Sequence, residues 1–341
     1  MIDLVKTSIQ TTDEMRRPPS ASRSGKDMTY HDHIRAISAD GESETMSNER
    51  HQLELSESDG ITTLRLVPNP DNPRGGMVVL DEWLIEQLHG ALDVIESNPP
   101  SVGLILASAS DRAFVAGADL AEIESKDDAQ LFAYLERAAA AYLRITNLDC
   151  PSVAVIGGSA LGGGLEIAMH CDGMIALETS EGSRPYLVGL PEAGLGLCPG
   201  WAGTQMLPAR MSPVDAIRAT ATGKPWKSDA LPTGLFDGRV SDASLLEEAG
   251  RSWLKQHPRH RRWDVPRCLD DLSRDVLIVA LDELESELPD AESAKAVIEC
   301  VRSGMDHGFM TALETERRLL VSLRHTPVAR ERLEAFLSRQ S

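Results

Sequence analysis

Two glutamates in otherwise apolar segments are the residues of this sequence best suited to proton transfer. Glu166 lies in SALGGGLEIAMHCD (residues 159–172), and Glu192 follows a proline in VGLPEAGLGLCPGWAGTQMLP (residues 188–208). Burial raises the pKa of a carboxyl group by desolvation, and a pair of such groups can hold a water and exchange protons with a substrate. The spacing of the two glutamates along the chain does not show whether they meet in space.

A glycine-rich turn directly precedes Glu166. Gly162, Gly163 and Gly164 have no Cβ, so their backbone N–H groups can approach a ligand closely. The helix that they enter favours negative charge at its N-terminus. The turn lacks the third glycine of GxGxxG, and no Lys-Ser/Thr pair follows it as in a P-loop. Glycines that only allow close packing are the structural alternative, which the two glutamates make less favoured.

The elements that must position these segments alternate between strand and helix. Short apolar runs at residues 102–108, 152–158 and 173–177 predict strands covered on both faces. Helical spacing of apolar residues follows the candidate N-cap Asp81 and recurs over residues 129–148. This alternation predicts an α/β fold.

The sequence changes character at its two ends. Residues 1–50 are small, polar and charged, which predicts a flexible leader with a short helical turn at residues 31–37. Order is expected to begin near residue 52, with a hairpin turn at Asp59-Gly60. From residue 241 the pattern is mainly helical, with helices expected at residues 244–256, 270–288, 291–305, 309–323 and 328–339.

Composition excludes several classes of function. The 341 residues carry a net charge of −19, which argues against nucleic acid as the main partner because phosphate binding needs a basic surface. No run of 18 apolar residues predicts a membrane span. The five cysteines form no CxxC pair, so neither a disulfide framework nor a metal site is expected. A cytoplasmic location fits these features.

Three segments in this order resemble the enoyl-CoA hydratase/isomerase (crotonase) family. FVAGADLAEI (residues 114–123), ALGGGLEIA (residues 160–168) and GLPEAGLGLCPG (residues 189–200) are most similar to the hydratase part of bacterial multifunctional fatty-acid oxidation enzymes. The resemblance extends over roughly residues 53–340. It implies a spiral of ββα units over residues 51–256, and then a helical trimerisation region over residues 257–341.

The resemblance also implies a reaction and its residues. The backbone N–H groups of Ala118 and Gly163 would form an oxyanion hole for the thioester oxygen. Glu166 would activate the water that adds at Cβ, and Glu192 would deliver or remove the proton at Cα. The expected activity is hydration of 2-enoyl-CoA thioesters without a metal or other cofactor, because CoA is part of the substrate.

Further substrate-binding positions follow from the matched motifs. Arg74 falls where the family often has a basic residue near the CoA phosphates, and Gly76 stands where asparagine is common. Trp201 replaces a small residue, so its indole either shortens the acyl tunnel or belongs to the core. The other expected contacts are Ala116, Asp119, Leu120, Gly162, Pro191, Leu195 and Gly200.

Three alternatives to the hydratase stay open. Isomerases of this family commonly use one acid at the position of Glu192 and do not need Glu166, so the presence of both favours hydration. Thioester hydrolases and decarboxylases reuse the same oxyanion hole, and a non-catalytic CoA-binding subunit is the third alternative. The resemblance further implies a homotrimer or a dimer of trimers, and a separate 3-hydroxyacyl-CoA dehydrogenase as a partner.

Overall fold

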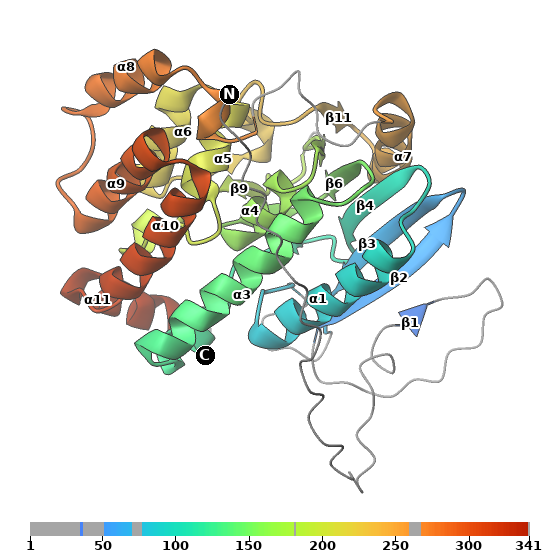
Figure 1. Cartoon of the computed structure of the whole chain (residues 1–341), viewed down its shortest axis with the longest axis horizontal. Helices are drawn as coiled ribbons and strands as arrows, with labels where there is room; N and C mark the ends of the chain where they lie inside the picture. The colour runs from blue at the N-terminus through green and yellow to red at the C-terminus, as the bar shows by residue number, and fades with distance from the viewer. Residues whose placement is uncertain (1–34, 37–50, 70–76, 181, 259–266, 340–341) are drawn as a thin grey trace, which may run out of the picture.

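The computed structural model describes residues 35–36, 51–69, 77–180, 182–258 and 267–339. Within them the strands form two sheets, one in the order β1-β2-β3-β4-β6-β8-β11 and one in the order β10-β9-β7-β5 (Figure 1). Only the β2–β3 and β9–β10 neighbours in these sheets are antiparallel. The strands are β1 Arg35–Ala36, β2 Gln52–Ser58, β3 Ile61–Val67, β4 Gly103–Ser108, β5 Ala113–Val115, β6 Ser152–Ile156, β7 Ser159–Leu161, β8 Gly173–Leu177, β9 Leu187–Gly189, β10 Trp226–Lys227 and β11 Gly238–Val240.

The helices between and after the strands account for the α/β class that the sequence predicts. They are α1 Glu82–Ser97, α2 Leu120–Ser125, α3 Asp128–Thr146, α4 Gly163–Met169, α5 Gly203–Arg210, α6 Pro213–Thr222, α7 Leu246–Gln256, α8 Arg274–Leu284, α9 Glu292–His307, α10 Phe309–Leu323 and α11 Pro327–Leu337, with the short 3-10 helices η2 Glu192–Leu195, η3 Ser228–Ala230, η4 Ala243–Leu245 and η5 Leu269–Asp271. The C-terminal helical region that was predicted is formed by α8–α11. The apolar spacing predicts neither α5 nor α6, because the chain near α5 is rich in glycine and proline and Pro208 lies inside this helix.

The apolar strands are buried on both faces, as their composition predicts. In β4, Leu104 and Leu106 belong to the main core, whereas Ile105 and Ala107 face a second cluster on the other side of the sheet. Helix α7 covers that second face through Leu246, Trp253 and Leu254. A strand with helices on both sides has no polar face to present to water, which explains the nearly continuous apolar runs.

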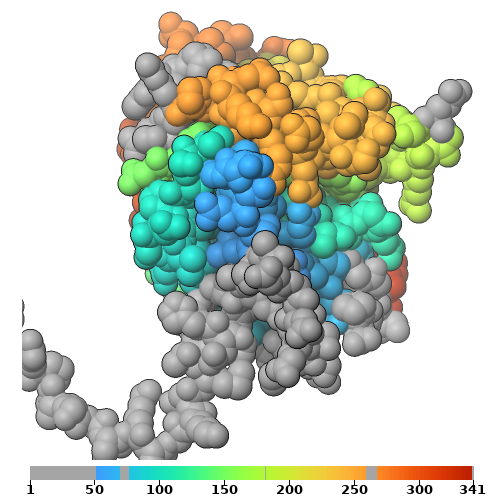
Figure 2. Space-filling view, turned by 90° about the vertical axis from the view of Figure 1, so that its right-hand side faces the viewer, coloured from blue at the N-terminus to red at the C-terminus, as the bar shows by residue number. Residues whose placement is uncertain are grey.

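The hairpin at Asp59-Gly60 is confirmed. Both residues have positive φ, +54° for Asp59 and +74° for Gly60, as a two-residue hairpin turn requires. The turn pairs Ser58 with Ile61 at the end of the β2–β3 ladder. Figure 2 shows the face on which this hairpin, in blue, lies beside α7, in orange, and Arg251 of α7 donates a hydrogen bond to the carbonyl of Ser58 (3.3 Å).

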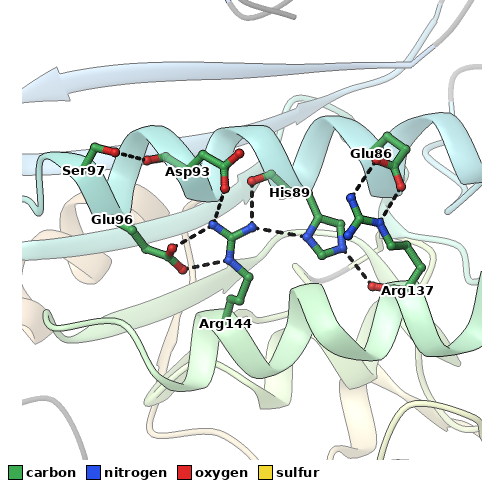
Figure 3. Close-up of polar contacts among 7 residues, drawn as sticks. All are labelled: Glu86, His89, Asp93, Glu96, Ser97, Arg137 and Arg144. Atoms are coloured by element: carbon green, nitrogen blue, oxygen red, sulfur yellow. Dashed lines mark hydrogen bonds and ion pairs between the residues drawn. The ribbon is translucent and has the colours of Figure 1, made fainter. Parts of the chain in front are cut away.

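An ion-pair network joins α1 to α3 (Figure 3). Arg144 of α3 donates to Asp93 (2.6 Å), to both carboxylate oxygens of Glu96 (2.8 Å each) and to the carbonyl of His89 (3.0 Å). Arg137 pairs with Glu86, and its carbonyl accepts from His89 Nε2 (2.9 Å). The shared geometry fixes α3 along α1 even though single exposed ion pairs contribute little to stability.

Helix α3 separates two parts of the molecule. It contacts α1, which lies against β2, on one side and α10 on the other. In Figure 1 the C-terminal helices therefore lie across α3 from the β2–β4 part of the larger sheet. None of the helices in the described ranges is both long enough and apolar enough to cross a membrane.

The expectation for residues 31–37 needs correction. Arg35 and Ala36 form the short strand β1, which runs parallel to β2, and not a helical turn. Pairing with the exposed edge of β2 satisfies backbone groups that a single helical turn would leave without partners. The remainder of the expected leader, residues 1–34 and 37–50, lies outside the described residues.

Candidate active site

One cavity collects most of the residues that the sequence singles out. Its volume is about 470 Å³, and the described residues that line it extend along the chain from Met77 to Phe336. The two glutamates and both expected N–H donors are among its walls. The expected residues that line it are Ala116, Ala118, Leu120, Gly162, Gly163, Glu166, Pro191, Glu192, Leu195 and Gly200.

Asp119, another expected contact, is not among the described residues that line this cavity. Asp119 caps α2 instead, since its carboxylate accepts hydrogen bonds from the N–H groups of Ala121 (2.9 Å) and Glu122 (3.4 Å). Arg74 and Gly76 lie outside the described residues, so their expected place near the CoA phosphates stays a prediction.

The backbone N–H groups of Ala118 and Gly163 take no part in the hydrogen bonds of the described strands and helices. Leu80 bonds to the carbonyl of Gly117 (2.9 Å) and to the N–H of Asp119 (3.0 Å), which flank Ala118. Because successive N–H groups of an extended segment point to opposite sides, the N–H of Ala118 is directed away from Leu80. Gly163 is the first residue of α4, where an N–H has no partner within its own helix.

Glu166 is held on α4 by the turn that leads into α5. Its side chain is only 1% exposed, and its Oε1 accepts hydrogen bonds from the N–H groups of Trp201 and Gly203, both at 2.8 Å. Burial raises the pKa of Glu166 well above its usual value, and the nearby carboxylates of Glu192 and Glu316 raise it further. The same two N–H bonds oppose this rise by stabilising the carboxylate.

Glu192 lies against the glycine turn at Gly162. It begins η2, and its Oε2 is buried without a hydrogen-bond partner in the described part of the chain. Burial, followed by the charge of Glu316, raises the pKa of Glu192 to about 8. A Cβ on Gly162 would lie 2.5 Å from Oε1 of Glu192, and Gly162 has φ +52°, so the close approach requires glycine there.

The charges of Glu166 and Glu192 act on each other, which answers the question that their spacing left open. Two buried like charges oppose each other's ionisation, so such a pair retains a proton near neutral pH. The cavity therefore presents a carboxyl group that can give a proton near neutral pH.

Sequence reasoning missed two tyrosines that support the walls of the cavity. Tyr134 donates to the carbonyl of Leu80 (2.7 Å), and Tyr142 donates to the carbonyl of Gly163 (3.2 Å). The indole of Trp201 lies edge-on to both rings and donates from Nε1 to the carbonyl of Leu135 (3.0 Å). Trp201 is 3% exposed and lines the cavity, so it belongs to the core and to the site at once.

Sequence reasoning also missed Glu316. It is fully buried on α10, and burial raises its pKa to about 7. Its sequence signal was a glutamate in an apolar stripe, three residues after Leu313 and four before Leu320. Such a position on a helix predicts burial, but nothing in the sequence showed which groups would meet the carboxylate.

The C-terminal helices close the cavity of their own chain. Leu320 of α10 and Phe336 of α11 line it. Arg332 of α11 donates to the carbonyl of Gly194 (3.2 Å), next to the catalytic candidate Glu192. These helices were expected to mediate trimerisation, which stays a prediction. Among the described residues, no group of three or more His, Cys, Asp and Glu side chains could hold a metal ion.

Comparison with known proteins decides the family. A family model described as enoyl-CoA hydratase/isomerase matches residues 77–274, which is more than half of the chain. The chain belongs to the enoyl-CoA hydratase/isomerase family. The matched residues include both glutamates, the glycine turn and the segment around Ala118.

Curated relatives match most of this chain in sequence. The fatty acid oxidation complex subunit alpha of Idiomarina loihiensis is 29% identical over 289 residues, 82% of this chain and 40% of that protein. The chain thus spans about two fifths of the length of the curated relatives it matches.

Solved structures confirm the crotonase fold. An enoyl-CoA hydratase from Bacillus halodurans superposes with a TM-score of 0.58 at 20% identity, covering 83% of this chain and 99% of that one. The human mitochondrial delta3-delta2-enoyl-CoA isomerase has a TM-score of 0.57 at 20% identity, covering 85% and 97%. Hydratase and isomerase share the fold, so fold does not choose between their reactions.

The buried acids of this family member predict a stability that depends on pH. Glu192 and Glu316 have folded pKa values of about 8 and about 7, above the usual 4.5, so the folded state holds protons that the unfolded state releases. Their stabilising effect is fully present below pH 4.5 and is lost as the pH rises to about 8. We expect the melting temperature of the parent to fall between pH 5 and pH 8.5 in thermal unfolding scans.

Glu192→Gln separates this effect from the general charge of the protein. It should flatten the decline because the buried titrating group is gone. Glu136→Gln, which changes an exposed glutamate on α3, should keep the slope of the parent. A decline of equal slope in Glu192→Gln and the parent would contradict the prediction.

Proposed function

We propose that this protein is a 2-enoyl-CoA hydratase that adds water across the double bond through an enolate held in an oxyanion hole. The observation that carries the proposal is the arrangement of Glu166 and Glu192 on one apolar cavity, beside the N–H groups of Ala118 and Gly163. The acyl-CoA thioester agrees with the substrates that the names of the family and of its hydratase neighbours describe.

The two N–H groups would bind the thioester oxygen. As water adds to Cβ, the electron pair of the double bond moves toward the carbonyl and charge gathers on that oxygen. Preorganised donors stabilise such charge strongly in a site that excludes water. The position of Gly163 at the start of α4 adds a helix N-terminus that favours the same charge.

The two glutamates would divide the proton transfers between them. Both hydrogen bonds that orient Glu166 end on Oε1, which leaves Oε2 to bind the attacking water and accept its proton. Glu192 would then give its proton to Cα, and its raised pKa keeps that proton available at neutral pH. One glutamate gains the proton that the other loses, so the charge of the pair is unchanged.

The acyl chain would extend toward Leu135, Trp201 and Leu320, which are among the residues that line the cavity. The indole of Trp201 limits the depth available there, because its Nε1 bond and two aromatic neighbours hold it in place. We therefore propose that the enzyme prefers short 2-enoyl chains, such as crotonyl, to long ones as substrates.

The test is the loss of conjugated enoyl-thioester absorbance when the protein meets crotonyl-CoA. A hydratase removes that absorbance and forms 3-hydroxybutyryl-CoA, which mass spectrometry identifies as the substrate plus one water. Absorbance that stays unchanged with crotonyl-CoA and longer 2-enoyl-CoAs, while a thermal shift shows binding, would overturn the proposal in favour of another thioester reaction or a CoA-binding subunit.

One feature favours an isomerase as the second candidate. The buried Oε2 of Glu192 has no hydrogen-bond partner among the residues that the structure describes, and the pKa of Glu192 is raised, which suits a single acid that moves a proton between two carbons. The same assay with a 3-enoyl-CoA separates the two reactions. An isomerase would create conjugated absorbance from this substrate without any gain in mass.

The assembly and the pathway follow from the relatives and remain proposals. The name of the relatives, fatty acid oxidation complex subunit alpha, supports a role in fatty-acid oxidation, and we propose that the protein acts in the cytoplasm. We propose a homotrimer or dimer of trimers that passes 3-hydroxyacyl-CoA to a separate dehydrogenase. A monomer at micromolar concentration in sedimentation velocity would contradict the trimer.

A further inference from the structure

The turn that holds Glu166 is shared between two glutamates. The N–H groups of Trp201 and Gly203 donate to Oε1 of Glu166, both at 2.8 Å. The two amides that alternate with them point the other way: Ala202 donates to Oε2 of Glu316 (2.6 Å) and Thr204 donates to Oε1 of Glu316 (2.9 Å). Four consecutive N–H groups thus bind two carboxylates on opposite sides of one short segment.

The carboxylate of Glu316 is held in place by burial and by further hydrogen bonds around the turn. It is completely buried, and Thr204 adds a second hydrogen bond from its hydroxyl group to the same Oε1. Gln205 donates to that hydroxyl oxygen (2.8 Å) and to the carbonyl of Cys300 on α9 (3.0 Å). Helix α10 supplies Glu316 from beside α3, far along the chain from Glu166.

The backbone conformation of the turn at residues 201–204 explains why it needs a carboxylate on each side. Ala202 has φ +78°, a left-handed conformation that a residue with a Cβ adopts at a cost. Such a conformation persists when the surrounding contacts determine it. The carboxylates of Glu166 and Glu316 supply those contacts from the two sides, so loss of either one frees the turn to relax.

We propose that Glu316 is a positioning residue of the active site, which fixes the turn at residues 201–204 and through it the carboxylate of Glu166. The proposal rests on the role given above to Glu166 in activating water. A shift of the turn by a fraction of an ångström moves Oε1 of Glu166 and rotates the carboxylate away from the water. Misplacement of a reacting group by about 1 Å can lower a rate by about 10²-fold.

The charged and titratable groups that face Glu316 come from several elements. They are Glu166 on α4, Glu192 on η2, Arg317 on its own helix, and the thiol of Cys198. Removing the charge of Glu316 therefore lowers the pKa of both active-site glutamates. The basic limb of the pH–rate profile, which would report the protonated form of Glu192, should move to lower pH.

The experiment compares Glu316→Gln and Glu316→Asp with the parent on crotonyl-CoA. Glutamine keeps the shape but has one oxygen where the two oxygens of Glu316 accept three hydrogen bonds, so we expect kcat to fall about 10²-fold with KM within about twofold. The basic limb should shift downward in the same variant. Aspartate keeps both oxygens and the charge, so it should recover part of kcat and the pH profile of the parent.

A matched variant on the same helix reports what destabilisation alone does. Leu313→Ala removes buried core volume on α10 without touching the cavity or the turn, so it should lower the melting temperature and keep kcat and the pH profile. Glu316→Gln with the kcat and pH profile of the parent, or Glu316→Gln and Leu313→Ala with the same losses, would overturn the proposal.

The outcome for Glu166 keeps the two proposals apart. If Glu166→Gln retains full activity, the assignment of Glu166 fails and the positioning role fails with it. If Glu166→Gln is inactive and Glu316→Gln is fully active, only the positioning role fails. Where Glu316→Gln does not fold, the Glu316→Asp variant still tests the prediction, since its shorter side chain must lower kcat without reproducing the pH profile of a neutral residue.

Discussion

Replacing Glu166 or Glu192 by glutamine is expected to lower kcat for the hydration of crotonyl-CoA by about 10²–10⁴-fold. Glutamine keeps the size of the side chain and can still accept hydrogen bonds, but it neither takes a proton from water nor gives one to carbon. The measurement is the initial rate of absorbance loss, with kcat and KM determined separately. KM should change little because neither carboxylate is needed to bind the CoA part of the substrate.

Glu166→Gln and Glu192→Gln should differ in which half of the reaction they retain. Glu192→Gln still has a base for water but no acid for Cα, so exchange of the Cα proton in deuterated water should stop. Glu166→Gln loses water addition and keeps that exchange, because Glu192 still faces the cavity. An equal loss of both reactions in both variants would contradict the division of roles, and water addition that survives in Glu166→Gln would favour a single-acid mechanism.

The matched control for both variants is Glu136→Gln. This exposed glutamate lies on α3, the helix that supports the site through Tyr134 and Tyr142, but it does not line the cavity. Its replacement should leave kcat and KM as in the parent. A comparable loss in Glu136→Gln would show that any change of charge on this acidic protein lowers the rate.

Gly163→Ala is the second change with a large expected effect. A Cβ at this position would lie 2.2 Å from Cζ3 and 2.6 Å from Cε3 of Trp201, which is far inside contact distance. The indole cannot retreat easily, because it bonds to the carbonyl of Leu135 and lies against Tyr134 and Tyr142. The start of α4 must move instead, and with it the N–H group that is proposed to bind the thioester oxygen.

We expect kcat/KM on crotonyl-CoA to fall about 10²–10³-fold in Gly163→Ala, the range for loss of one oxyanion-hole donor. The double variant Gly163→Ala with Trp201→Ala should recover part of this loss, because it removes the ring that the new methyl group meets. Trp201→Ala alone costs stability by leaving a cavity in the core, so melting temperatures accompany each rate.

Gly238→Ala provides the control for glycine replacement in general. A Cβ at Gly238 would meet only Cγ1 of Ile175 at 3.8 Å, an ordinary contact, and its φ is not positive. This variant should keep the activity of the parent. Full activity in Gly163→Ala would show that Gly163 does not supply an oxyanion donor in this position.

The local structure of this protein was determined largely by its sequence. The helix α10 was predicted with its observed bounds, Phe309–Leu323, and Asp81 and Asp119 cap helices as their side chains favour. Apolar runs in β4 and β6 identified strands with both faces covered. These features depend on neighbours within a few residues, so periodicity and capping chemistry are sufficient to predict them.

Part of the candidate site was predicted, and that prediction came from the motifs that resemble the family. Glu166, Glu192, Ala118 and Gly163 line one cavity as the resemblance to the family implied. Composition and spacing alone identified only two unusual glutamates and a glycine turn. Helices α5 and α6 escaped prediction because glycine and Pro208 favour loops, and the contacts of α5 with α4, α6, α9 and α10 override that local preference.

What the tertiary structure decided is which distant groups meet. Glu316 and the turn at residues 201–204 are separated by more than a hundred residues, yet they share hydrogen bonds at 2.6 and 2.9 Å. Trp201 was ambiguous in the sequence, and the structure gives it both roles because it lies where the core and the cavity wall coincide. Sequence pattern records the burial of a residue, whereas its partner is set by the packing of whole elements, which no local spacing encodes.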